Sequence, residues 1–140
     1  MMETRGEQAV EKRNNGYNCA QAVACTYCDK VGMDEETLFK VTEAMGVGMG
    51  NMEGTCGVLT GAAVILGLRN STANLESPNS KGATLRLARR VMEQFKERNQ
   101  SVLCKDLKGR DTGVVLRSCP DCVRDACEFL EQLLEELEVE

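Results

Sequence analysis

Apolar residues recur at three- and four-residue steps along almost the whole chain, and this spacing restricts the chain to helical folds. The clearest case lies after Cys119, where one apolar helical face is opposed by glutamates. That face consists of Val123, Ala126, Leu130, Leu133, Leu134 and Leu137. Only the stretch TGVVL (112–116) resembles a short strand. We therefore predict an all-α protein.

Capping residues and glycines divide the chain into separate helices. The predicted helices cover about residues 19–32, 35–45, 56–68, 83–98, 101–107 and 119–137. Asn18, Asp34 and Thr55 precede the first three and can cap them. Cys119 at the cap and Pro120 in the first turn open the last. The helix over 83–98 is predicted to bury a stripe of Leu85, Ala88, Val91, Met92 and Phe95. We find no repeat or long linker, and expect one domain over residues 1–140, a bundle of about six or seven helices.

Length and charge exclude several classes of protein. A chain of 140 residues can fold on a hydrophobic core without covalent staples. The net charge of −5 argues against a nucleic-acid binder, which would carry a basic stripe. No window approaches the roughly 20 apolar residues that span a bilayer, so we expect no membrane insertion. The polar start lacks the apolar core of a secretory signal, and we expect a cytoplasmic location.

Cysteine is abundant and histidine is absent. The absence of histidine removes Cys-His catalysis, histidine-containing zinc sites and histidine-ligated haem. The eight cysteines are Cys19, Cys25, Cys28, Cys56, Cys104, Cys119, Cys122 and Cys127. In a cytosolic chain with a proper core, so many cysteines indicate redox chemistry or metal binding. The alternative is that some are small buried hydrophobes.

The segment GVGMGNMEGTCGVLTG (46–61) holds six glycines around one cysteine. A phosphate-binding loop would end in Gly-Lys-Ser/Thr, but no lysine lies between positions 41 and 80. The spacing of Gly46, Gly48 and Gly50 also differs from the dinucleotide fingerprint, and the preceding element is helical. A nucleotide site is therefore disfavoured.

A thiol site fits this segment better. Cys56 falls in the first turn of a predicted helix, where free backbone N–H groups and the helix dipole favour an anion and lower a thiol pKa. Gly57 and Gly61 share one face of that helix, so another backbone can approach beside the sulfur; alternatively, they serve only a tight helix–helix contact. The same position near a helix start recurs at three other cysteines, which are Cys19, Cys104 and Cys119.

The stretches GYNCAQAV, GMGNMEGTCGVLTGAAVILGL, CKDLKG and CPDCVRDACEFL together resemble the C_GCAxxG_C_C family, whose members are described as redox-active because of their cysteines. The resemblance covers about residues 6–137. It implies that the catalytic thiols are Cys19, Cys56, Cys104 and Cys119, with Gly57 and Gly61 as the binding positions beside them. Val58 stands where the family motif has alanine. Whether Cys119 or Cys122 is the fourth site cysteine stays open. Family members tend to be encoded beside transporter genes, so the resemblance suggests a transporter-linked redox partner but names no substrate.

The other sulfur-containing residues have more ordinary interpretations. Cys25 and Cys28 lie on the helix face opposite Cys19 and are expected to pack or to form a spare surface pair. Cys119 and Cys122 form a Cys-Pro-Asp-Cys sequence like a thioredoxin-type redox pair. Cys127 is expected in the core. Met49 and Met52 could be soft copper ligands, although such methionines more often fill gaps.

Three hypotheses for the function follow. The first is a redox-active protein whose four cysteines exchange thiols and disulfides or transfer electrons, with Cys56 as the attacking thiolate. The second is a module in which Cys19, Cys56, Cys104 and Cys119 bind a [2Fe–2S] or [4Fe–4S] cluster or zinc. The third is a transporter-associated interaction module with structural cysteines. The sequence establishes no cofactor, no oligomeric state and no electron donor or acceptor.

Overall fold

The computed structural model describes residues 3–139, and within them the chain is all-α, as the sequence predicts. The regular helices are α1 (Arg5–Asn14), α2 (Cys19–Thr26), α3 (Glu35–Thr42), α5 (Gly57–Asn70), α6 (Lys81–Asn99), α7 (Cys104–Lys108) and α8 (Cys119–Val139). Two 3₁₀ turns, η1 (Cys28–Val31) and η2 (Glu43–Met45), follow α2 and α3. The short segment α4 (Gly46–Met49) contains left-handed residues and is a tight turn rather than a helix. Between residues 3 and 139 there is no strand, only an isolated bridge between Thr55 and Leu103.

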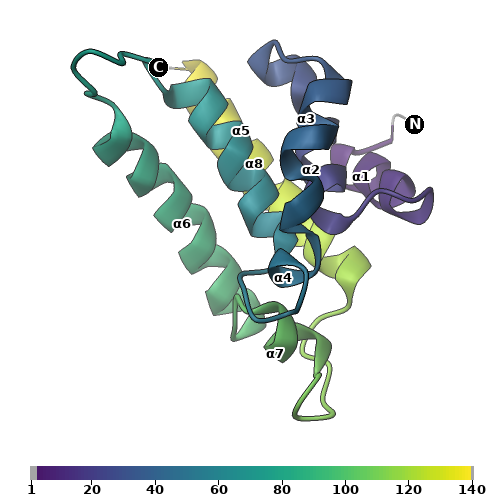
Figure 1. The fold of residues 1–140 in the computed structure, drawn as a ribbon. Helices are drawn as coiled ribbons and strands as arrows, with labels where there is room; N and C mark the ends of the chain where they lie inside the picture. Colours follow the sequence, from purple (N-terminus) through teal and green to yellow (C-terminus); the bar gives the residue numbers. More distant parts are fainter. Residues whose placement is uncertain (1–2, 140) are drawn as a thin grey trace.

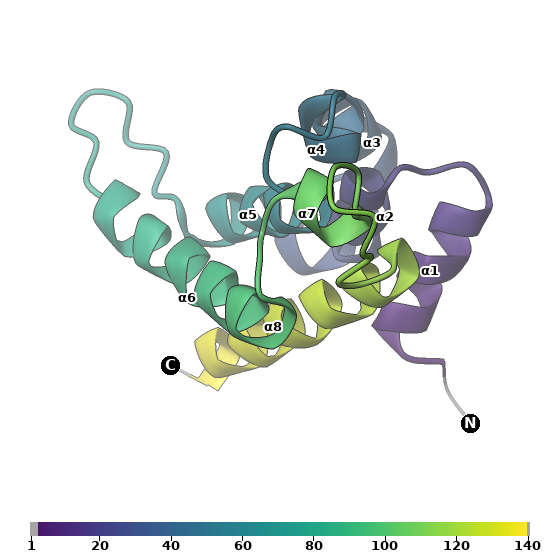
Figure 2. The ribbon, with the colours of Figure 1, turned by 90° about the horizontal axis from the view of Figure 1, so that it is seen from below.

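Helices α2 and α5 lie side by side at the centre of the molecule (Figure 1). Helix α8 packs against α1, α2, α5 and α6, and so joins the two ends of the chain. At one end of the bundle, the short helix α7 and the turn α4 lie close to the start of α8 (Figure 2). The N-terminal ends of α2, α5, α7 and α8 are therefore gathered at this end.

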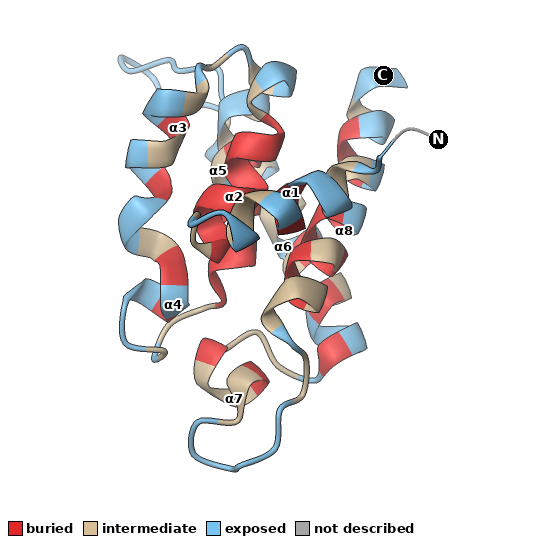
Figure 3. Ribbon diagram, turned by 90° about the vertical axis from the view of Figure 1, so that its right-hand side faces the viewer, coloured by how far each residue is buried: buried red, intermediate tan, exposed pale blue. Residues whose placement is uncertain are grey.

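The core is formed by the apolar faces of these helices. Helices α2 and α5 are buried along most of their length, whereas α3 shows mainly exposed positions (Figure 3). The predicted apolar face of α8 is buried from Val123 to Leu134, and Leu137 is partly buried. None of the helices described is long and apolar enough to cross a membrane.

The predicted helix starts are confirmed at two positions and wrong at two others. Asn18 accepts a hydrogen bond from the backbone N–H of Gln21, whose side-chain oxygen accepts one from the backbone N–H of Asn18. The Asp34 carboxylate accepts a hydrogen bond from the backbone N–H of Thr37 and so caps α3. Thr55 does not cap α5, because Cys56 holds that position without a side-chain hydrogen bond. Ser118, rather than Cys119, accepts a hydrogen bond from the Asp121 N–H at the start of α8.

Three further features differ from the sequence-based expectation. Helix α1 was not predicted, because its sequence is mostly polar and only Ala9 and Val10 are buried. Leu85 was expected in the buried stripe of α6 but is 59% exposed, because α6 meets the core mainly through Val91 and Phe95. The stretch TGVVL forms no strand, and its two valines are exposed.

Candidate functional site

Four cysteines from distant parts of the sequence line one pocket of about 480 Å³. They are Cys19, Cys56, Cys104 and Cys119, the four that the sequence resemblance singles out. Cys19 is the first residue of α2, Cys56 caps α5, Cys104 is the first residue of α7, and Cys119 is the first residue of α8. The gathering of four helix starts at one end of the bundle thus brings the four side chains to one cavity.

The two motif glycines allow α2 and α5 to approach closely. A Cβ atom at Gly57 would lie 2.5 Å from the Cys19 Sγ atom, and one at Gly61 would lie 2.6 Å from the Ala20 carbonyl oxygen. Real Cβ atoms do not come so near, so larger residues would force the helices apart. The glycines therefore serve a tight helix contact, and that same contact sets the Cys19 side chain against the start of α5.

The glycine-rich loop holds α7 rather than an anion. The backbone N–H of Cys56 donates to the Val102 carbonyl oxygen at 2.7 Å, and the N–H of Cys104 donates to the Gly54 carbonyl oxygen at 3.1 Å. Gly48 has a positive φ of 56°, and a Cβ there would lie 2.6 Å from the Cys104 Cβ atom. Only glycine satisfies both conditions. The loop thus fixes Cys104 beneath it.

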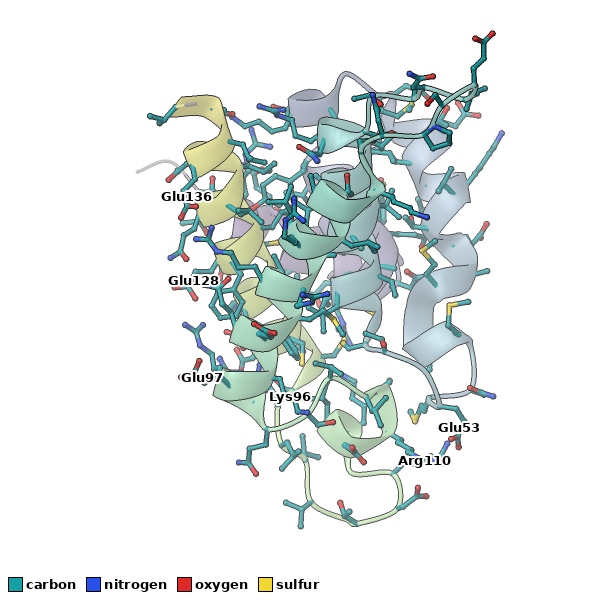
Figure 4. The ribbon with its side chains drawn as sticks, turned by 90° about the vertical axis from the view of Figure 1, so that its left-hand side faces the viewer. Glu53, Lys96, Glu97, Arg110, Glu128 and Glu136 are labelled. Atoms are coloured by element: carbon teal, nitrogen blue, oxygen red, sulfur yellow. The ribbon has the colours of Figure 1, made fainter. Side chains whose placement is uncertain are left out.

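Charged side chains reinforce this docking at the surface. The Arg110 Nη2 atom lies 2.6 Å from a Glu53 carboxylate oxygen, and the Lys105 Nζ atom lies 3.3 Å from the other. Figure 4 shows Glu53 and Arg110 side by side at the lower end of the molecule. Glu53 belongs to the glycine-rich loop, and both cations belong to α7 or the turn after it. These ion pairs therefore tie the two parts of the chain together.

Cys119 is the most accessible of the four thiols and has two cationic neighbours. It is partly exposed, whereas the other three are buried, Cys56 to 1% exposure. The Arg13 Nε atom donates a hydrogen bond to the Cys119 Sγ atom at 3.0 Å. Lys108 lines the same pocket, and its positive charge opposes the rise in the Cys119 pKa that Cys19 and burial cause. A reagent that enters from solvent therefore meets Cys119 first.

The thiol pKa values differ from the sequence-based expectation, which was that helix starts would lower them. Interaction with Cys119 lowers the pKa of Cys19, but interaction with Cys56 and burial raise it by more. The Cys122 thiol and burial raise the pKa of Cys56 to about 12. The expectation was wrong because the thiols are desolvated and interact with one another, so the first thiolate formed opposes a second.

The other two site thiols show the same direction. Burial raises the pKa of Cys104. Interaction with Cys19, together with burial, raises the pKa of Cys119 above its usual range, although Lys108 and Arg13 oppose the change. The four thiols therefore hold their protons at neutral pH. Protonation therefore does not distinguish Cys56 from Cys119, but exposure does, because Cys56 is buried to 1% exposure and Cys119 is partly exposed.

Cys122 lies next to the pocket residue Cys56. It is fully buried, and its Sγ atom lies 3.8 Å from the Arg117 carbonyl oxygen. Its thiol raises the pKa of Cys56. Of the two cysteines between which the sequence left the fourth site residue open, Cys119 lies at the cavity wall and Cys122 does not.

The other four cysteines do not line the pocket. None of the eight cysteines of the chain forms a disulfide. Cys25 is buried, with its Sγ atom 3.8 Å from the Glu35 carbonyl oxygen, and Cys28 is partly exposed. Cys127 is buried, in agreement with its predicted place in the core. Burial raises its pKa to about 12.

The pocket side chains are not arranged as the ligands of a metal ion or a cluster. Structural zinc and iron–sulfur sites need several sulfurs around one centre, at about 2.3 Å from the metal in the case of zinc. Within residues 3–139, no three Cys, Asp or Glu side chains are grouped as the ligands of one metal ion. Met52 lines the pocket, but Met49 does not and is 59% exposed. The side chains as they stand do not fit a cluster, zinc or a pair of methionine ligands for copper.

Comparison with known proteins identifies the family of the chain. The family model described as "Putative redox-active protein (C_GCAxxG_C_C)" matches residues 17–133. This match includes all four cysteines that line the pocket and both motif glycines. Neither the curated proteins nor the solved structures provide a match.

Proposed function

Because the chain belongs to the C_GCAxxG_C_C family of redox-active proteins, we propose that its four-cysteine pocket performs thiol–disulfide exchange. The observation that carries the proposal is that Cys19, Cys56, Cys104 and Cys119 line one cavity although 100 residues separate the first from the last. Residues that serve only to fill a core have no need to meet at a solvent-reached pocket. The proposal keeps these four as site residues, with Gly57 and Gly61 as the positions that admit Cys19.

Cys119 is the attacking thiol in this proposal, and Cys19 is the resolving thiol. Only the thiolate form attacks, and Arg13 and Lys108 supply positive charge beside the Cys119 sulfur. Its sulfur attacks one sulfur of a substrate disulfide; the substrate S–S bond breaks, and the released thiolate takes up a proton. Cys19, whose thiol interacts with that of Cys119, then attacks the mixed disulfide. A second substrate thiol leaves, so two protein thiols become one disulfide and the substrate gains two electrons.

A thiol count tests the proposal. Protein purified without oxygen is assayed for free thiols and for metal, and then exposed to a mild oxidant. The expected result is eight free thiols, a colourless protein, a reversible loss of two thiols, and no such loss in Cys119→Ser. The matched control is Cys28→Ser, which changes a partly exposed cysteine outside the pocket and should lose two thiols as the wild type does.

Other outcomes support the other hypotheses. Visible absorbance with bound iron, or stoichiometric zinc, would replace thiol exchange by the metal hypothesis. Thiols that stay inert to oxidant, with serine tolerated at all four positions, would favour the interaction module with structural cysteines. Either result contradicts the proposal.

A further inference from the structure

The charge of the pocket is opposite to the charge of the chain. The whole sequence carries a net charge of −5. The pocket lining contains two cations, Arg13 and Lys108, and no Asp or Glu. With 22 acidic residues in the chain, a cavity wall with no carboxylate and two cations marks a distinct electrostatic environment.

In the described part of the chain, Lys108 has no carboxylate partner, and the ionisable groups that act on it are the thiols of Cys119, Cys122 and Cys56. Its Nζ atom is buried and has no hydrogen-bond partner among the residues described. The neighbouring cations of the same turn are paired, since Lys105 and Arg110 both contact Glu53. Neither Arg13 nor Lys108 forms an ion pair with a carboxylate within residues 3–139. A buried ammonium without a hydrogen-bond acceptor is costly, and an anion that enters the pocket can supply that acceptor.

The size of the cavity limits what that anion can be. A volume of about 480 Å³ lies within the usual range for small-molecule sites, roughly 300–1,000 Å³. The wall also includes Tyr17, Val47 and Met52, which can contact an aliphatic chain. A compact molecule with a short carbon chain and a terminal negative charge meets both conditions.

We propose that the pocket selects a low-molecular-weight disulfide that carries carboxylates, and that Lys108 binds one of these carboxylates while Cys119 attacks the disulfide. Arg13 does not bind the carboxylate in this proposal, because it donates its hydrogen bond to the Cys119 sulfur. The inference rests on the proposed thiol exchange and adds the class of substrate. The exchange itself is unchanged: the protein gains one disulfide, and the small disulfide is reduced to two thiols.

The test compares three small disulfides of similar size and different charge. Dithiodipropionate is a dianion, bis-hydroxyethyl disulfide is neutral, and cystamine is a dication. Thiol loss in the folded protein is measured for each, and each rate is divided by the rate with the same chain unfolded in urea, which has no pocket. The dianion is expected to react about tenfold faster than the neutral reagent, and the dication slower, with differences that shrink as salt is added.

Lys108→Gln and Lys105→Gln form a matched pair of variants. Both remove one positive charge from α7, but Lys105 is paired with Glu53 and does not line the pocket. Lys108→Gln is expected to reduce the preference for the dianion over the neutral reagent about tenfold, and Lys105→Gln to leave it within about twofold. Any loss of thiolate reactivity affects all three reagents alike and cancels in the ratio. Lys108→Arg, which restores the charge, should recover much of the preference.

The outcomes separate this inference from the proposed function. Equal normalised rates for the three reagents, or an unchanged preference in Lys108→Gln, would overturn the anionic substrate and leave thiol exchange in place. Reaction with peroxide but with none of the three disulfides would overturn it as well. A pocket that reacts with no oxidant at all would instead contradict the proposed function.

Discussion

Gly61→Ala is the substitution whose effect follows most directly from the packing of α2 on α5. The new Cβ atom would lie 2.6 Å from the Ala20 carbonyl oxygen and 3.2 Å from its Cα atom. Both are backbone atoms within α2, so no side chain can rotate to make room. Such overpacking costs about 1–3 kcal/mol, while alanine gains about 0.5–1 kcal/mol over glycine in a helix. We expect a net loss of about 1–2 kcal/mol in the free energy of unfolding.

Gly67→Ala is the matched control in the same helix. No atom lies within 4 Å of a Cβ atom built at Gly67, so only the helix-propensity gain remains. This variant should be more stable than the wild type by about 0.5–1 kcal/mol. The two variants should therefore differ by about 2 kcal/mol although the chemical change is identical.

Urea denaturation followed by circular dichroism measures the difference. The expected result is a lower midpoint for Gly61→Ala and a higher one for Gly67→Ala, with unchanged m-values. Equal midpoints for the two variants would refute the close approach of α2 and α5. They would also remove the reason for placing Cys19 beside the start of α5.

Three further predictions concern the buried charges and thiols. Raising the pH from 9 to 11 should reduce the free energy of unfolding, because the pKa of Cys127 is about 12 in the folded chain and about 8.5 in the unfolded chain, so only the unfolded chain loses this proton. In urea titrations, Cys127→Ala should remove about 1.4 kcal/mol of this loss per pH unit. An unchanged dependence of the free energy on pH in that variant would contradict the burial of Cys127. Asp125→Ala should cost about 3 kcal/mol in the same assay, because Arg117 donates two hydrogen bonds of 3.0 Å to this buried carboxylate; a loss below about 0.5 kcal/mol would contradict a structural role. In stopped-flow measurements, the rate of disulfide formation should rise about tenfold per pH unit from pH 6 to 8, because the raised pKa of Cys119 keeps the thiolate fraction small in this pH range. A rate independent of pH would mean that Cys119 is already a thiolate at neutral pH.

The sequence predicts the fold class and most helices because periodicity, capping residues and glycines are local signals. Asn18 and Asp34 cap the helices that they were expected to cap, and Gly109 ends α7 in a left-handed conformation. Helix α1 was missed because only Ala9 and Val10 of its ten residues are buried, and because its ion pairs, such as that between Arg5 and Asp29 at 2.8 Å, join distant parts of the chain. Such pairs join residues far apart in sequence and leave no periodic pattern.

The sequence could name candidate site residues, but it could not predict the burial of those residues or the charges around them. The family motif singles out the four cysteines that line the pocket and the two glycines at the contact between α2 and α5. It says nothing of Lys108, whose importance depends on the burial of a single nitrogen atom. The pKa directions were wrong for the same reason: a position at a helix start can be read from the sequence, whereas desolvation and neighbouring thiols depend on the folded chain.

Peptide mapping of the mildly oxidised protein by mass spectrometry tests the central claim most directly. If the helix starts gather the four sulfurs as described, the first disulfide to form joins Cys19 to Cys119, and iodoacetamide still labels Cys25, Cys28 and Cys127 after denaturation. A first disulfide between any two of Cys25, Cys28 and Cys127, or eight labelled cysteines after oxidation, would contradict it.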